Sequence, residues 1–350
     1  MARRKKGLGA AFWLMATIAS GGGLTGYLTG QFPQLSSWLT VSPSREAERS
    51  SESSDLTGDF FGSRSGEGSD TSPAASQAPV AVESNGRLLI ASFNIQVLGQ
   101  SKMRKPQVVQ VLSQVIRQFD LVAIQEIRSK EEDVLPRLLA AVNANGSRYD
   151  FLIGPRLGRS VSKEQYAFLF DTQRVEYEPG SVGTISDPTD LLHREPFVAR
   201  FRAKATRPNE AFTFWLVNIH TDPDEVPQEL DALSDVFRVM QQNRSDEDDV
   251  ILLGDLNASP EKFGALLQLP NIGWAIDGVT TNTRRTKTYD NLLFSREKTQ
   301  EYTGRWGVLD LEKTFGISYE QALEVSDHLP VWSEFSGLEF SGLEFSGTLQ

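Results

Sequence analysis

The sequence is poor in three things on which many enzymes and binding proteins depend: cysteine, histidine and positive charge. It has no cysteine, which excludes thiol nucleophiles, disulfides and cysteine-bound metals. Its three histidines are too few for a typical zinc site. The net charge of −11 argues against a protein that holds nucleic acid by bulk electrostatics, because neutralising phosphates requires a basic surface. A basic face on an acidic body is still compatible with this total.

Charged residues are also absent from residues 7–44, directly after a basic run at positions 3–6. This order is typical of an export signal. The apolar stretch 8–18 has the length of a signal peptide, whereas the apolar character that resumes after it favours an uncleaved anchor. We therefore predict a signal peptide or a membrane anchor in residues 1–40, with residues 7–29 as the tether in the second case. Either way, the body of the protein is expected outside the cytoplasm, secreted or anchored to the membrane.

One globular domain is expected, in residues 86–336, and its size allows a substantial core. Before it, residues 41–85 are dominated by Ser, Gly, Glu, Asp and Pro. Such a composition cannot offset its own ordering entropy and predicts a flexible linker. After the domain, residues 337–350 repeat parts of the pentapeptide Phe-Ser-Gly-Leu-Glu and are interpreted as a short tail.

Apolar runs of strand length recur through this domain, and two amphipathic stretches with helical spacing lie between them. The strand-like runs are residues 88–93, 121–124, 166–170, 197–201, 212–219, 250–253, 289–294 and 329–332. The helical faces are marked by Val108, Val111, Leu112, Val115, Ile116 and Phe119, and by Leu230, Leu233, Val236, Phe237 and Met240. The order of strand, helix, strand, helix and then mostly strands predicts an α+β sandwich in which helices cover packed sheets.

Polar side chains follow four of these strands at the point where each strand ends. The residues concerned are Asn94, Glu126, His220 and Asp255. Strand ends hold side chains rigidly beside loops, where binding and catalytic groups are commonly found. Carboxylate and amide oxygens suit a hard cation such as Mg²⁺, Mn²⁺ or Ca²⁺. The pattern therefore indicates a site for a divalent metal.

Among the three histidines, His328 has the surroundings most typical of a catalytic residue. The segment Ser326-Asp327-His328 places an acid and an imidazole directly before an apolar strand. Hydrolysis of a phosphodiester needs groups that transfer protons near neutral pH, and imidazole is such a group. His193 has no comparable setting and is expected to be structural.

Five short motifs occur in order along the domain. They are Ile90-Ala91-Ser92-Phe93-Asn94-Ile95, Ile124-Gln125-Glu126-Ile127-Arg128, Gly254-Asp255-Leu256-Asn257-Ala258, Thr288-Tyr289-Asp290 and Ser326-Asp327-His328-Leu329-Pro330. In order and approximate spacing, the chain resembles the endonuclease/exonuclease/phosphatase superfamily and, within it, the deoxyribonuclease I branch. The resemblance covers the whole domain and implies a four-layer α/β/β/α sandwich.

The resemblance also implies a divalent metal cofactor, for which we expect Mg²⁺ or Mn²⁺, with Ca²⁺ as the alternative. Glu126 would be the principal metal ligand, and Asn94, Asp255 and Asp327 would complete or border the site. The cation would neutralise phosphate charge in the transition state. Asp255 is counted among the catalytic residues as well.

Two histidine–carboxylate pairs are implied for the chemistry. His220 would pair with Glu164, and His328 with Asp290, each carboxylate fixing its imidazole's tautomer and raising its basicity. One imidazole would activate a water molecule while the other protonates the leaving oxygen, and the assignment of these two roles is left open. Asn257 would hydrogen-bond the scissile phosphate or the attacking water.

Substrate contacts are implied for Arg128, Arg194 and Thr281. The planar guanidinium of arginine suits phosphate oxygens, although both arginines could equally be surface ion-pair partners. Thr281 and Thr283 resemble the family's threonine-rich substrate loop.

The chain departs from the deoxyribonuclease I pattern at four places. Gln96 replaces an arginine that contacts DNA, and Ser162 replaces a tyrosine that packs on a sugar. Residues 181–192 lack the cysteines of a disulfide-closed loop, and Val279 replaces an acidic residue that helps to bind structural calcium. These departures concern the binding of duplex DNA and of calcium, and they leave the chemical centre intact.

The function predicted from the sequence is hydrolysis of DNA phosphodiester bonds by an extracytoplasmic, metal-dependent endonuclease, with RNA as a further substrate. We expect a monomer. One alternative keeps the same centre and changes the substrate to a phospholipid headgroup or a small phosphorylated metabolite. An inactive nucleic-acid-binding domain is the alternative from another class, and the presence of both histidines and Glu126 argues against it.

Overall fold

The computed structural model describes residues 86–205, 207–242 and 247–340. The predicted export segment (1–40), the predicted linker (41–85) and residues 341–350 lie outside the described residues. Within the part of the chain that is described, no helix has both the length and the apolar character needed to cross a membrane.

The strands of the described chain form two mixed sheets. The first has the order β12 (Tyr302–Val308), β13 (Val331–Ser336), β1 (Arg87–Leu98), β2 (Leu121–Ile127), β4 (Gln165–Asp171) and β3 (Tyr149–Ile153). The second has the order β10 (Ile272–Trp274), β11 (Asp290–Ser295), β9 (Val250–Asp255), β8 (Thr213–His220), β7 (Phe197–Ala203) and β5 (Val175–Tyr177), with β6 (Gly183–Thr184) paired to β7. The pairs β1–β2 and β8–β9 are parallel, so the carboxyl ends of each pair lie at the same edge of the sheet.

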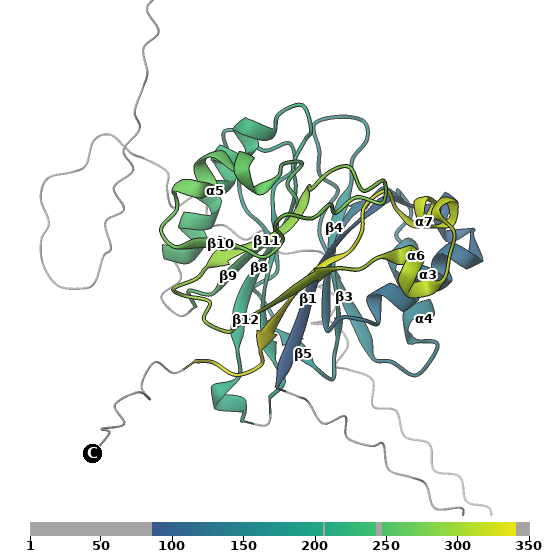
Figure 1. The fold of residues 1–350 in the computed structure, drawn as a ribbon, viewed down its shortest axis with the longest axis horizontal. Helices are drawn as coiled ribbons and strands as arrows, with labels where there is room; N and C mark the ends of the chain where they lie inside the picture. Colours follow the sequence, from purple (N-terminus) through teal and green to yellow (C-terminus); the bar gives the residue numbers. More distant parts are fainter. Residues whose placement is uncertain (1–85, 206, 243–246, 341–350) are drawn as a thin grey trace, which may run out of the picture. The chain divides into compact units, whose positions relative to one another are not determined.

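Helices cover the outer face of each sheet (Figure 1). The first sheet packs on α2 (Gln100–Met103), α3 (Pro106–Ile116), α4 (Val134–Asn143), α6 (Leu311–Phe315) and α7 (Tyr319–Val325). The second packs on α5 (Val226–Gln242) and on the short 3-10 helices η3 (Pro260–Lys262) and η4 (Gly264–Gln268), while η2 (Pro208–Glu210) precedes β8. The predicted four-layer α/β/β/α sandwich is therefore confirmed.

The core between the sheets is rich in phenylalanine. Phe168 of β4 stacks on Phe197 of β7 with ring centroids 5.1 Å apart, and it meets Phe201 edge-on at 5.3 Å. All three side chains are fully or almost fully buried. Truncating a ring in such a core costs about 3–5 kcal/mol, so these contacts hold the two sheets together.

The two-residue period of a strand determines which residues reach the space between the sheets. In β1, Leu88 and Ile90 face the inner core, whereas Ala91 and Phe93 face the helices. Farther along the strand, Ser92 and Asn94 take the next two inward positions. The same alternation turns Glu164, His220, Asp255 and Asp290 inward. The space between the sheets is therefore apolar in its middle and collects these polar groups at one end.

Residues 337–340, which the sequence assigned to the tail, continue from β13 across to the second sheet. Gly337 donates its amide to the carbonyl of Gly86 and accepts from the amide of Phe212. Glu339 donates its amide to the carbonyl of Glu210. The chain thus stays hydrogen-bonded to the domain beyond residue 336.

Candidate active site

The polar end of the inner space gathers the two predicted histidine–carboxylate pairs. His220 Nδ1 lies 2.7 Å from Glu164 Oε1, and His328 Nδ1 lies 2.9 Å from Asp290 Oδ2. Both carboxylates are completely buried. Since each Nδ1 faces a carboxylate, each ring carries its proton there and directs Nε2 away from its partner.

Asp255 lies between the two imidazoles. Its Oδ2 is 3.6 Å from His220 Nε2 and 3.5 Å from His328 Nε2. The register of the second sheet explains this position, because Asp255 pairs with His220 on β8 and with Asp290 on β11. The strands thus place His220, Asp255 and Asp290 at one point, and Glu164 and His328 join them from the segments just before β4 and β13.

The charges of this group are strongly interdependent. Burial by itself would raise the pKa of Glu164, but His220, Arg194 and Arg128 lower it to about 2. Burial would lower the pKa of His220, and the charge of Glu164 raises it instead. The pKa of His328 is raised well above its ordinary value, against burial, by Asp290 and Asp255. Each imidazole is therefore stabilised in its protonated form by its carboxylates.

The pKa values of Asp255 and Asp290 are shifted in opposite directions. Burial would raise the pKa of Asp255, but His328 and His220 lower it. The pKa of Asp290 is raised by burial and by the charge of Asp255, against the opposing charge of His328. The difference follows from geometry, since Asp255 faces two imidazoles and Asp290 faces one.

Beside this group, Glu126 and Asn94 form a set of oxygen ligands. The Asn94 side-chain amide donates to Glu126 Oε1 at 3.3 Å and to Asp255 Oδ2 at 3.0 Å. Its Oδ1 is buried and has no hydrogen-bond partner among the described residues. An orphaned carbonyl oxygen next to a carboxylate that is partly exposed fits a hard divalent cation.

A second grouping with suitable distances is Asp255, Asp290 and His328, whose ligand atoms lie within 4.8 Å of one another. In this grouping the His328 imidazole already faces Asp290 through Nδ1. We favour Glu126 and Asn94 as the metal site, with Asp255 at its border, because the buried Asn94 Oδ1 lacks a partner among the described residues.

Asp327 is held at the rim of the same end. The Gln96 side-chain amide donates to its Oδ2 at 3.0 Å. Ser326, its neighbour, donates to the carbonyl of Asn94 at 2.7 Å and accepts from the amide of His328 at 3.1 Å. Gln96, noted in the sequence only as a departure, thus positions a predicted metal-site residue.

Two non-glycine residues of the group have left-handed backbones, Glu126 with φ 63° and Asn257 with φ 48°. Such conformations are costly and persist mainly where the surrounding structure requires them, often at functional sites. The amide of Asn257 donates to Asp255 Oδ1, and its side chain donates to the carbonyl of Thr221. Gly254, which precedes Asp255, has φ 150°, and a Cβ there would lie 1.9 Å from the Ile219 carbonyl oxygen. Only glycine fits at that position.

The three predicted substrate contacts are placed differently from one another. Arg128 is partly exposed and spans Glu126 and Glu164, each at 3.3 Å. Arg194 is buried, and its Nε lies 2.9 Å from Glu164 and donates to the His220 carbonyl. Thr281 is buried and donates to Asp290 Oδ2 at 2.7 Å. In this structure the last two side chains support the acids of the pairs.

Sequence reasoning gave no role to three further residues of the group. The Tyr166 hydroxyl accepts from the His220 amide at 2.9 Å, and Ser326 makes the contacts described above. Lys102 donates to the carbonyls of Gln96 and Val325, and burial lowers its pKa to about 8 despite Asp327 and Glu126. The alternation of residues in β4 indicates that Tyr166 faces inward toward the site. No local sequence pattern marks Lys102 in this way.

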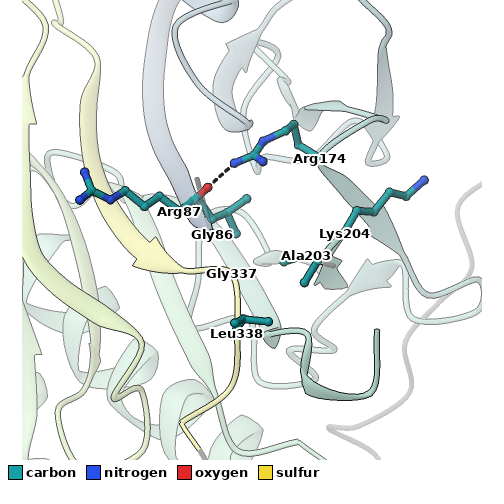
Figure 2. Close-up of a pocket in the computed structure, with 9 residues that line it drawn as sticks. Gly86, Arg87, Arg174, Ala203, Lys204, Gly337 and Leu338 are labelled. Atoms are coloured by element: carbon teal, nitrogen blue, oxygen red, sulfur yellow. Dashed lines mark hydrogen bonds between the residues drawn. The ribbon is translucent and has the colours of Figure 1, made fainter. Parts of the chain in front are cut away.

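The third histidine lies apart from both pairs. His193 Nδ1 faces Asp222 Oδ2 at 3.4 Å, and its amide bonds to Glu229. A cavity of about 40 Å³ is also remote from this centre, at the amino-terminal end of β1. Figure 2 shows Arg174 reaching the Arg87 carbonyl at its edge, with Gly337 close by. The chemistry described above therefore does not involve this cavity.

Comparisons with known proteins agree with the geometry. The family model Endonuclease/Exonuclease/phosphatase matches residues 91–328. Deoxyribonuclease gamma of Rattus norvegicus is 32% identical over 268 residues, which cover 70% of this chain and 83% of the relative. Deoxyribonuclease-1-like 1 is 34% identical in Sus scrofa, over 71% of this chain and 80% of the relative, and 34% identical in Homo sapiens, over 69% and 82%.

Among solved structures, the fold is similar to that of humanized D. rerio TDP2. The TM-score is 0.51 at 16% identity, over 71% of this chain and 99% of the other. That likeness supports the fold alone. With its family model, relatives, five ordered motifs and polar strand ends in agreement, the chain belongs to the Endonuclease/Exonuclease/phosphatase family and is a hydrolase.

Proposed function

We propose that this protein is a divalent-metal-dependent endonuclease that hydrolyses phosphodiester bonds of DNA outside the cytoplasm. The observation that carries the proposal is the convergence of two imidazole Nε2 atoms on Asp255, beside the Glu126–Asn94 pair. The relatives named deoxyribonuclease support the substrate class.

The mechanism we propose divides proton transfer between the two histidines. A neutral imidazole takes a proton from the attacking water at Nε2, and the protonated one gives its proton to the leaving oxygen. Glu164 and Asp290 hold the rings in place through Nδ1. Asn257 orients the water or the scissile phosphate.

A divalent cation, when bound, would neutralise the charge that develops on the phosphate. Glu126 and Asn94 would hold it, with Asp255 and Asp327 at its border. Arg128 is the basic group best placed to meet a phosphate oxygen, because its side chain remains partly exposed.

The test is nicking of supercoiled plasmid by the full chain with Mg²⁺ or Mn²⁺. We expect His220→Ala and His328→Ala each to slow nicking by at least about 10²-fold, the usual contribution of a general acid or base. His193→Ala is the matched control, since the third histidine lies outside the pairs, and it should nick at nearly the wild-type rate. Unchanged nicking in both pair variants would exclude the mechanism.

The substrate class is tested separately, by comparing duplex DNA, single-stranded DNA, RNA and sphingomyelin at equal enzyme concentration. We expect duplex DNA to be hydrolysed fastest. Hydrolysis of sphingomyelin alone would instead assign the centre to a phospholipid headgroup, in keeping with the acidic net charge.

Export rests on the basic and apolar order of residues 1–40. We propose that the mature protein is either released or tethered by residues 7–29. Cell fractionation with amino-terminal sequencing of the mature chain distinguishes the two, and recovery of intact protein from the cytoplasm would contradict both.

A further inference from the structure

A second cluster of acids lies at the opposite end of β9. Asp249 precedes the strand, Glu301 precedes β12, and Glu339 belongs to the segment after β13. Each offers a carboxylate oxygen, and the three oxygens lie within 4.8 Å of one another. Asp249 is 5% exposed and Glu301 is 2% exposed. Three acids from distant parts of the sequence thus share one buried place.

The protein supplies little to balance this charge. The ion pairs of the described residues include none to Asp249, Glu301 or Glu339, and the nearby Arg200 reaches Glu247 at 3.3 Å. Main-chain amides help in two places. The amide of Thr213 donates to Glu339 Oε1, and the amide of Phe340 donates to Glu301 Oε1, both at 2.7 Å.

Independent evidence for a ligand comes from polar atoms that point into the cluster without a partner. The Thr299 hydroxyl is 1% exposed and makes no hydrogen bond of ordinary length with any described residue. It lies close enough to Asp249 to oppose the rise in pKa of that carboxyl. Asp249 Oδ1 and Glu301 Oε2 are also buried and unpartnered. Buried polar atoms are normally satisfied, so three together indicate a missing partner.

We propose that Asp249, Glu301 and Glu339, with the Thr299 hydroxyl, bind a hard divalent cation of the calcium type. Calcium accepts six to eight oxygen ligands in irregular geometry, whereas magnesium requires a near-ideal octahedron and keeps several waters. A buried site lined by protein oxygens from three segments suits the first better. This site is independent of the proposed function, because the six residue steps from Asp249 to Asp255 span about 20 Å of extended chain.

Burial first, and then the neighbouring acids, disfavour the charged forms of the carboxyls in and beside this cluster. Burial, Glu301 and Glu247 raise the pKa of Asp249 to about 9, and burial raises that of Glu247 to about 7. A bound cation would relieve this repulsion by pairing with the charged forms.

The cation would fix the carboxyl-terminal segment to the domain. Figure 2 shows Gly337 and Leu338 running beside Gly86 and Ala203, and Glu339 follows directly. Backbone hydrogen bonds already guide this segment from Gly86 to Glu210. Asp249 and Glu301 directly precede strands of the two sheets, whereas Glu339 lies in the segment after β13, so occupancy of the site and docking of this segment are coupled.

The test is thermal unfolding of the full chain in Ca²⁺ and in EGTA. A Glu126→Ala background removes the principal ligand of the other site from both samples. At Ca²⁺ concentrations about 100-fold above Kd, we expect the Tm to rise by roughly 5–10 °C. Glu339→Gln should abolish most of this rise. Asp248→Asn, the matched control, should keep it, because Asp248 is exposed and pairs with Lys298.

Two results in the Glu126→Ala background would overturn the proposal: a Tm that Ca²⁺ does not change, or a full Ca²⁺ response after Glu339→Gln is added. A second readout covers the case in which that variant fails to fold. Ca²⁺ should slow cleavage after Glu339 by a glutamate-specific protease several-fold in the wild type and in Asp248→Asn, but not in Glu301→Gln. Equal protection in Glu301→Gln would also count against the site.

Discussion

The two ends of β9 carry acids in opposite electrostatic situations. At the carboxyl end, Asp255 faces His220 and His328, which lower its pKa against the effect of burial. At the amino end, Asp249 faces Glu301 and Glu247, which add to the effect of burial and raise its pKa to about 9. The same residue type is therefore stabilised as an anion at one end of the strand, whereas at the other end its charged form is disfavoured unless a cation binds. The first situation suits chemistry on a phosphate, and the second suits binding of a cation.

The comparison is tested most strongly by removing charge from the carboxyl end. We expect Asp255→Asn to lower kcat/KM for plasmid nicking by about 10²–10⁴-fold, because Asp255 faces the Nε2 atoms of both imidazoles that transfer protons. Asp248→Asn, an equal change at the amino end, should leave kcat/KM within about two-fold of wild type, since effects at distant sites are independent. Steady-state nicking at saturating metal measures both, and equal losses would remove the distinction between the two ends.

A second test uses pH to examine the ion pairs that lower the pKa of Glu164. Its pKa is about 2 in the folded protein and 4.5 as the ordinary value, so its pairing stabilises the fold above pH 4.5 and is lost as pH falls toward 2. The shift corresponds to roughly 3 kcal/mol. Glu164→Gln should therefore be less stable than wild type by about that amount at pH 6, with the gap closing toward pH 2. Denaturant unfolding along this series measures it, and a gap independent of pH would contradict the assignment.

Chelators should affect the two ends of β9 differently, and theirs is the smallest of the effects expected here. In excess Mg²⁺, EGTA is expected to lower the Tm by several degrees through loss of Ca²⁺ from the amino end. The nicking rate well below the Tm should stay within about two-fold of its value without EGTA. EDTA in excess over all metal should abolish nicking. Loss of nicking in EGTA with excess Mg²⁺ would show that the two ends share one cation requirement.

Much of the candidate site could be predicted because its residues follow apolar strands. Glu126, His220 and Asp255 stand at the ends of their strands, and Asn94 stands where the regular pairing of β1 with β2 is interrupted. The two-residue period and parallel pairing bring them to one edge. Glu164 has no such local signal, because it precedes its strand among ordinary polar residues. It was identified only through the resemblance to a family.

In other parts of the fold, the sequence pattern was too weak to predict the strands and helices. The strand β12 is largely exposed and contains two glycines, and β5 and β6 have three and two residues, so the alternation is too short or too polar to recognise. The helices α6 and α7 are likewise short, and only their capping residues Asp310 and Ser318 mark them.

The acidic cluster was not predicted at all. Asp249, Glu301 and Glu339 come from three separate segments, and no motif links them. Their meeting depends on the crossing of residues 337–340 to the second sheet, which the repeated composition of the tail concealed. Arg194 gives a related lesson, since sequence alone did not reveal that its side chain is buried against Glu164.

The crossing of residues 337–340 also determines where the chain can be shortened. Ending it at residue 336 would leave the amides of Phe212 and Thr213 without their acceptors. Exposed and unpaired strand edges of this kind invite pairing between molecules. A purification tag or a fusion partner is therefore better joined after Phe340 than directly after β13.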